Sequence, residues 1–459
     1  MGIHRFVRIA AGQCELACAV DPGDWGNVSV VGTASPTIRM TRQAPASVSF
    51  FGNFGSMNLG NEATLLAMVS RLRLLFPNCR FSCICSHPEN VVATHGIHAV
   101  PHTVRSVRIW DRQVPLGKRV RMAFLGLGEE VREYIRAWRE LKGVDMFIIP
   151  GTGLLTDAFG LSGWGPYGLL KWSLVARLRG CRVVFVSVGA GPVHGRLGRF
   201  LLKRALTLAE YRSYRDVPSG EVVESLGVRT SDDRIYPDLV FGLSANPLPE
   251  QADRGTRPVV GLGLMEYSGK YSVPDPVPDT YGRYLESLGV VVGWLLDHEY
   301  DVKLLLGDAD TFVIDDLRAV LQERLAPNIA ARVTDHPIGS IHELLSQLGA
   351  TDLVVATRFH TVLMSLLLGK PAIAISFHHK CSSLMSDMGL SEYCQDINRI
   401  DADALIAKFQ ALVQHADELE RMIAQRVEEA RRALDEQYEV LFENPLDGSR
   451  PIHGTAAAT

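Results

Sequence analysis

Two series of apolar, strand-like runs that alternate with helical stretches constrain the fold most. The first series contains SVSFF, DMFIIP and RVVFVSV, and the second contains VVGLGL, LVVA and PAIAIS. Such runs are apolar at nearly every position, which is expected of strands buried on both faces within a parallel sheet. The pattern therefore predicts an α/β protein with two parallel-sheet domains and a cleft between them. Ligands of such sheets bind at the carboxyl ends of the strands.

The segment LSANPLPEQADRGTRP separates the two series, and its proline and polar content is typical of a linker. A long charged helix is expected after the second series. The predicted parts are a weakly ordered extension (1–45), a first domain (46–243), a linker (244–258), a second domain (259–400), a C-terminal helix (401–443) and a tail (444–459).

Composition excludes several classes of protein. Of 459 residues, 47% are hydrophobic and 21% are charged, as in folded enzymes, and the net charge of −4 gives no general attraction for nucleic acid. No apolar run reaches the ~18 residues of a membrane span. The eight cysteines form no CxxC pair, which favours free thiols in a reducing cytoplasm and no zinc site.

Glycine-rich loops follow three of the predicted strands, in GNFGSMNLGNEA, PGTGLLTD and SVGAGPV. Glycine lets a ligand approach the backbone, and the N-terminus of a helix attracts anions or sugar hydroxyls. Tight turns capped by asparagine remain the alternative. Glu62 is either a base or a carboxylate at a helix start. The candidate cleft residues of these loops are Asn53, Asn58, Gly60, Gly151 and Gly153.

Three cationic side chains follow neighbouring strands in ATRFHTVLMSLLLGKPAIAISFHHK. Arg358 and His360 come directly after one strand, and Lys380 follows the next. The helix that starts here is almost entirely apolar and therefore interior, so an arginine at its start needs an anion. A pocket for a small dianion or trianion is one interpretation. A buried arginine–carboxylate pair with a core histidine is the other.

Arg215 follows the run YRSY and can offer a two-pronged contact to carboxylate or phosphate. Asp216 either orients Arg215 or forms an ordinary structural pair with it, and Asp238 in YPDLVF either caps a turn or faces the cleft. A scatter of arginines and lysines over 105–121, with Trp110, is either a solvated face or a surface for an anionic membrane or a pyrophosphate-bearing acceptor.

Taken in order, these motifs resemble the polysaccharide pyruvyl transferases, over roughly residues 47–395. The chain departs from that family at Asn61, where the family has aspartate, and at Thr152, where it has glycine. The resemblance implies a fold of two Rossmann-like domains like that of the GT-B glycosyltransferases. It implies phosphoenolpyruvate as the donor, a sugar of a cell-surface glycan as the acceptor and a pyruvate ketal as the product. The donor-binding positions carried over are Arg215, Arg358, Phe359, His360 and Lys380. The resemblance makes the first domain the acceptor side, with its cleft loops, and the second domain the donor side.

The resulting hypothesis is a ketal-forming transferase that needs no metal and no cofactor, since phosphoenolpyruvate is a co-substrate. Arg358 binds the donor, and His360 acts as general acid or stabilises the leaving phosphate. Glu62 and Asp238 are weaker candidates for activating the acceptor hydroxyl. The partners expected are the donor and the sugar, not nucleic acid, and the expected location is the cytoplasm. A lipid-linked acceptor and peripheral contact with the inner face of the membrane stay open.

Two other functions remain open. One is a nucleotide-sugar glycosyltransferase or epimerase of the same architecture, which would bind a base in the second domain. The other is a catalytically inactive glycan-binding or scaffolding protein, which the changes at Asn61 and Thr152 favour and the intact Arg358, His360 and Lys380 disfavour.

Overall fold

The computed structural model describes residues 44–56, 58–104, 116–243, 256–267, 279–306 and 312–443, with the side chains of 116–126 excluded. The expectations for the N-terminal extension, for most of the linker and for the tail fall outside these ranges. So do Arg105, Trp110 and the other basic residues before the third helix. No helix within the described ranges is long and apolar enough to span a bilayer.

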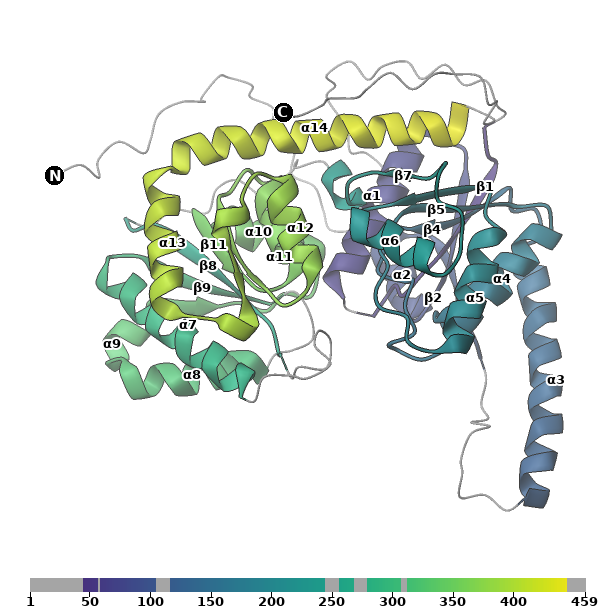
Figure 1. The fold of residues 1–459 in the computed structure, drawn as a ribbon, viewed down its shortest axis with the longest axis horizontal. Helices are drawn as coiled ribbons and strands as arrows, with labels where there is room; N and C mark the ends of the chain where they lie inside the picture. Colours follow the sequence, from purple (N-terminus) through teal and green to yellow (C-terminus); the bar gives the residue numbers. More distant parts are fainter. Residues whose placement is uncertain are drawn as a thin grey trace. The chain divides into compact units, whose positions relative to one another are not determined.

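The first domain is built on a parallel sheet of seven strands in the order β3-β2-β1-β4-β5-β6-β7 (Figure 1). Phe50 of the first strand lies opposite Cys83 on one side and Ile148 on the other, and every residue of that strand is buried. The strands are β1 (Ser47–Phe51), β2 (Arg80–Cys85), β3 (His98–Pro101), β4 (Met146–Pro150), β5 (Arg182–Val188), β6 (Tyr211–Tyr214) and β7 (Arg234–Ile235).

Two α-helices of the first domain begin at a capping side chain. Asn58 caps the first helix by accepting a hydrogen bond from the Asn61 amide, and Asp216 caps the sixth from the Ser219 amide. The helices are α1 (Leu59–Leu75), α2 (Pro88–His95), α3 (Leu116–Glu140), α4 (Pro166–Leu178), α5 (Arg196–Thr207), α6 (Val217–Ser225) and the 3-10 turn η1 (Leu239–Gly242).

The second domain repeats this plan with a parallel sheet of six strands in the order β10-β9-β8-β11-β12-β13. The strands are β8 (Val259–Leu264), β9 (Asp301–Leu306), β10 (Val333–Asp335), β11 (Leu353–Ala356), β12 (Ala372–Ser376) and β13 (Cys394–Asp396). The helices are α7 (Thr280–Asp297), α8 (Phe312–Arg324), α9 (Pro327–Ala330), α10 (Ile341–Gly349), α11 (Phe359–Leu367) and α12 (His379–Asp387), with the 3-10 turns η2 (Ser391–Tyr393) and η3 (Ile397–Arg399).

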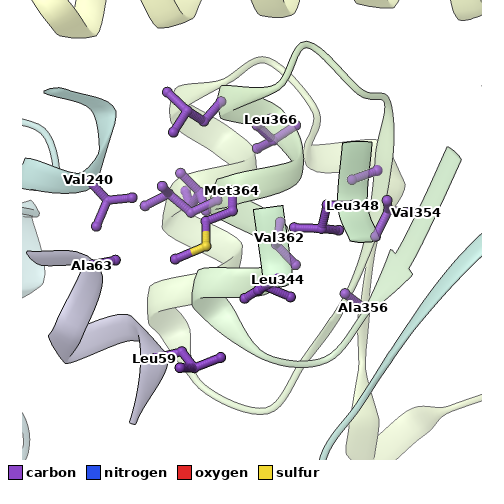
Figure 2. Close-up of a cluster of buried hydrophobic side chains, with 14 of the residues drawn as sticks. Leu59, Ala63, Val240, Leu344, Leu348, Val354, Ala356, Val362, Met364 and Leu366 are labelled. Atoms are coloured by element: carbon purple, nitrogen blue, oxygen red, sulfur yellow. The ribbon is translucent and has the colours of Figure 1, made fainter. Parts of the chain in front are cut away.

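The apolar helix α11 is interior, as its sequence predicts, because both domains contribute to its surroundings. Figure 2 shows Met364 of this helix with Leu344 of α10, and with Leu59 of α1 and Val240 of η1 from the first domain. Each of these side chains is at most 4% exposed. The elements that carry the predicted site therefore rest on one shared apolar cluster.

The sequence predicts one C-terminal helix over 401–443, but the structure has two helices there. The chain forms α13 (Ala402–Gln414) and then α14 (Ala416–Glu443), with His415 between them. Helix α14 contacts α11 of the second domain and η1 of the first. Near its end, Gln437 is fully buried and donates to the hydroxyl groups of Ser187 and Ser213 at 2.9 and 2.8 Å. This helix thus connects both domains.

Candidate active site

Arg215 follows β6 directly and is held by two carboxylates. Its Nη1 lies 3.3 Å from Asp238 Oδ2, and its Nε lies 3.4 Å from Asp216 Oδ2. Burial raises the pKa of Asp238, although Arg215 opposes this. For Asp216, Arg215 and Ser219 outweigh burial and lower the pKa. Asp216 therefore both orients Arg215 and forms an ion pair with it. The buried arginine has a fixed orientation, and the two carboxylates offset much of its positive charge.

The loop after β5 packs against the Arg215 guanidinium. A side chain at Gly189 would place its Cβ 2.7 Å from the guanidinium carbon, so it would displace Arg215 from this position. Two residues earlier, Ser187 has the left-handed φ of 48°, which is uncommon for a residue with a side chain. Its hydroxyl accepts from Gln437, and its amide donates to Ser213 Oγ at 2.9 Å. These hydrogen bonds hold the loop at Arg215.

The second domain adds Phe359 and His360 from the first turn of α11, after Arg358 at its N-cap. The Arg215 guanidinium carbon lies 5.0 Å from the centroid of the Phe359 ring, a cation–π distance. The same turn approaches α1 so closely that a Cβ at Gly60 would lie 1.9 Å from His360 Nδ1. Contacts between the domains therefore place α11 beside both Arg215 and α1.

His360 is uncharged at neutral pH in the ligand-free protein. Burial lowers its pKa to about 3, together with the positive charges of Arg215, Lys380 and Arg358. Its Nε2 atom is buried and has no hydrogen-bond partner within the described ranges. A buried polar atom without a partner is costly, and such atoms cluster where a ligand is expected to complete the bonding.

Lys380 lies in the first turn of α12, after His378 at the N-cap. Burial and then the charge of Arg215 lower its pKa to about 7, against the raising effect of Asp216. A Cβ at Gly153 would lie 3.1 Å from Lys380 Nζ and 4.0 Å from Arg215 Nη2. The two cations thus converge on the glycine loop after β4.

The structure therefore brings together Arg215, Phe359, His360 and Lys380, with Gly60 and Gly153 beside them. Two further groups of this region did not stand out as site residues in the sequence. Gly189 belongs to a loop that the sequence singled out only as a whole. His378 and His379 have ring centroids 4.0 Å apart, and burial lowers the pKa of both, to about 3 for His378. The pair of consecutive histidines directly before Lys380 is the sequence feature that could have indicated these two residues.

The other predicted residues lie in the same loops but mostly bond within the protein. The Glu62 carboxylate accepts from the Gly55 amide at 2.6 Å and lies 3.3 Å from His95 Nε2. Asn53 accepts from the Ser86 hydroxyl at 2.5 Å, and Asn58 caps α1. Gly151 packs near Leu239 and Thr64. For these positions the geometry supports a role in shaping the loops, and Asp238 combines such a role, as cap of η1, with its contact to Arg215.

Other parts of the described chain offer no comparable centre. No group of three or more histidine, cysteine, aspartate or glutamate side chains in the described ranges could hold a metal ion. A cavity of about 250 Å³ lies beside β1, β2 and β3 and is lined by Arg80, Glu140 and Lys142 among others. None of the predicted site residues lines it, so the chemistry is better placed at the cations.

Solved structures with the same fold support this architecture. A UDP-N-acetylglucosamine 2-epimerase matches with a TM-score of 0.52 at 11% identity, over 91% of this chain and 100% of that one. Anabaena Alr3699/HepE in complex with UDP matches with a TM-score of 0.53 at 12% identity, over 85% and 99%. At such identities the likeness concerns the fold alone, which is GT-B-like, with two parallel-sheet α/β domains.

Sequence comparison is more specific. The amylovoran biosynthesis protein AmsJ of Erwinia amylovora is 24% identical over 325 residues, which cover 66% of this chain and 73% of the relative. A family model described as polysaccharide pyruvyl transferase matches residues 58–379, from the cap of α1 to the residue before Lys380. This range covers most of both domains and includes Arg215, Arg358 and His360, and the chain belongs to the polysaccharide pyruvyl transferase family.

Proposed function

We propose that the protein transfers the pyruvate group of phosphoenolpyruvate to two hydroxyl groups of a sugar in a cell-surface polysaccharide or its precursor. The product is a pyruvate ketal, and phosphate is released. The observation that carries this proposal is that Lys380 and Arg215 converge on the Gly153 loop, while their charges and that of Arg358 act on His360, which lies against Gly60. Phosphoenolpyruvate presents a carboxylate and a phosphate on a three-carbon frame, and this charge suits a compact group of cations.

The charge available to a donor is unevenly distributed. Arg215 is already contacted by Asp216 and Asp238, so its guanidinium contributes orientation more than net charge. The ammonium of Lys380 has no ion pair or hydrogen bond within the part of the chain that the structure describes, and its pKa of about 7 shows how poorly it is compensated. An arriving dianion would remove that cost. Lys380 is therefore our principal phosphate ligand.

The chemistry requires a proton at the methylene carbon of the donor, which leaves an oxocarbenium-like centre at C2. One sugar hydroxyl adds to C2 and passes its proton to the base left by the group that protonated the methylene carbon. The C2–O bond to phosphate then breaks, and the second hydroxyl closes the ring and passes its proton to the released phosphate. The bound donor's negative charge raises the pKa of His360, which allows this side chain to act as the general acid only after the donor binds.

The test is incubation of the purified protein with phosphoenolpyruvate and a panel of simple and lipid-linked glycosides. We expect release of inorganic phosphate together with an acceptor mass gain of one ketal-linked pyruvate. Parallel reactions with nucleotide sugars should release no nucleoside diphosphate. Nucleotide release without phosphate release would contradict the proposal in favour of a glycosyltransferase. A thermal shift with phosphoenolpyruvate but no product on any glycoside would favour a binding protein.

A further inference from the structure

Over residues 127–140, where the side chains of helix α3 are described, the helix packs on the first domain by one side. Ala137 lies in the last turn of α3, and Leu141 directly follows the helix. Both are at most 1% exposed and belong to the core of the domain. Glu133, on the same side, is buried and bonded to Lys171 at 3.1 Å and to Arg136 at 2.9 Å. These contacts, together with hydrogen bonds from Arg136 to the carbonyls of Pro101 and His102, attach the helix to the domain.

A second apolar row lies on another side of the same helix and is exposed. Its members recur at intervals of three or four residues, so they form one stripe along the helix. A helix that packs by one side needs no second stripe, and a contiguous exposed apolar surface marks an interaction site. The row comprises Leu127 (62% exposed), Val131 (53%), Ile135 (46%) and Trp138 (45%).

The end of α4 extends this surface. The guanidinium carbon of Arg179 lies 4.7 Å from the centroid of a Trp138 ring, which places the last turn of α4 beside the row. In that turn Leu178 is 65% exposed. We call the surface formed by the row and Leu178 the α3 face. It contains five large apolar side chains from two helices, and none of them contributes to the candidate active site.

Basic side chains flank the α3 face, and the acidic ones lie elsewhere. At about 100° per residue, Arg132 and Arg139 project next to the apolar row, and both are exposed, as is Lys142 just beyond the helix. The acidic residues of this part of the helix project on the side away from the row, at Glu129, Glu130, Glu133 and Glu140. Glu133 is buried, Glu130 accepts from the Tyr167 hydroxyl, and Glu140 lies 3.7 Å from His98. An apolar stripe bordered by positive charge is the pattern of helices that lie in the interface of an anionic bilayer.

We infer that the α3 face binds the surface of a membrane that contains anionic lipids. The apolar row and Leu178 enter the boundary between headgroups and acyl chains, Trp138 occupies the interfacial depth that tryptophan prefers, and Arg132, Arg139 and Lys142 contact lipid phosphates. This inference goes beyond the proposed function and does not depend on it. Its consequence is that the enzyme works at the bilayer, where a lipid-carried acceptor would be concentrated.

A second copy of the chain fits the α3 face less well. A helix pair would use the heptad positions 127, 131, 134 and 138, but Tyr134 already packs against the core of the first domain. In a symmetric pair, Arg132 and Arg139 would also face the same charges on the other copy. Self-association is therefore the alternative outcome of the test.

The experiment is co-sedimentation of the full chain with vesicles, without either substrate. Vesicles of equal parts phosphatidylglycerol and phosphatidylcholine should carry down the wild-type protein, and pure phosphatidylcholine vesicles should carry down much less. The variant Leu127→Ser/Val131→Ser/Ile135→Ser should bind at least about tenfold more weakly, because it removes most of the apolar surface that enters the bilayer. Arg132→Gln/Arg139→Gln should lose the preference for anionic vesicles.

A matched control replaces exposed apolar residues of the second domain, Val290 and Phe312, by serine. It should bind vesicles like the wild type. All variants should keep the wild-type unfolding temperature, which shows that they fold. Equal vesicle binding by the triple variant and the control would overturn the inference. So would a wild-type dimer that ignores vesicles and dissociates in the triple variant, as measured by analytical ultracentrifugation.

Discussion

At the scale of single residues, the sequence predicts which side chains meet but not their charge. The spacing of Arg358, His360 and Lys380 at the ends of neighbouring strands was enough to expect one pocket. The protonation states depend on burial and on charges from the other domain, above all Arg215, which lies far away in sequence. For the same reason, the sequence suggested that Asp216 contacts Arg215, because the two are neighbours, but gave no sign that Asp238 does so as well.

Lys380 gives a prediction that concerns protons. Since its pKa is about 7 without ligand, the ammonium is mostly deprotonated at about pH 8.5, and binding of an anionic donor must restore its proton. We expect wild-type protein to take up protons on binding phosphoenolpyruvate at this pH, as measured by calorimetry in two buffers of different ionisation enthalpy. Lys380→Met should show less uptake and weaker binding.

The same group gives an independent control through stability. A lysine whose pKa is lowered on folding destabilises the protein fully below about pH 7, and this cost fades as the pH rises toward the ordinary lysine value. Lys380→Met should therefore raise the unfolding temperature more at about pH 6 than at about pH 9. An effect that does not change with pH would contradict the lowered pKa.

Arg358 and His360 give a prediction about turnover. Arg358→Ala and His360→Ala should each reduce transfer from phosphoenolpyruvate by at least about a hundredfold, the usual range for loss of a general acid or a charge-stabilising group. Phosphate release and the unfolding temperature are measured together. His336→Ala, at an exposed histidine of the same domain, should leave the rate unchanged. A folded His360→Ala protein with near wild-type turnover would exclude His360 from the chemistry.

At the scale of elements, strands and loops follow the sequence more closely than helix packing does. The continuous apolar runs predicted the inner strands, because a strand that is buried on both faces has apolar side chains on both of them. The sequence shows that the loops contain glycines, but it does not show why glycine is present at each position. A side chain at Gly60 would collide with His360, and a side chain at Gly189 would collide with Arg215. Only the folded chain shows which neighbour excludes a side chain.

Gly60 tests this distinction. In Gly60→Ala the new Cβ would lie 1.9 Å from His360 Nδ1, so we expect a loss of about 1–3 kcal/mol in unfolding free energy from overpacking. Displacement of His360 should also reduce transfer by about a hundredfold. Gly128→Ala, in α3 with no atom within 4 Å of the added Cβ, should instead gain up to about 1 kcal/mol. Urea unfolding and phosphate release distinguish the two.

At the scale of the whole molecule, the two domains share one apolar cluster and one terminal helix. The sequence predicted two sheets, a linker and a long final helix. It could not predict the break at His415, because no proline or glycine marks it, nor that α14 reaches back to the first domain. Those contacts join residues separated by 250 positions, as Gln437 and Ser187 are, and no local pattern records them.

Gln437 tests how far α14 supports the site. Gln437→Leu should cost about 1–3 kcal/mol in unfolding free energy, because the buried hydroxyl groups of Ser187 and Ser213 lose a partner. It should also weaken donor binding, since Ser187 supports the loop at Arg215. Gln425→Leu, at an exposed position of the same helix, should stay within about 0.5 kcal/mol of wild type. Equal stability of both variants would show that the buried amide is dispensable.

The reach of α14 also bears on how the enzyme is made. A ribosome completes β5 and β6 long before it adds Gln437, so both sheets can form while Ser187 still lacks the amide that holds it. The loop after β5, which packs against Arg215, would then reach its final geometry only when translation is almost finished. Chains released early are expected to be folded in large part and yet inactive, which would keep incomplete copies from consuming phosphoenolpyruvate.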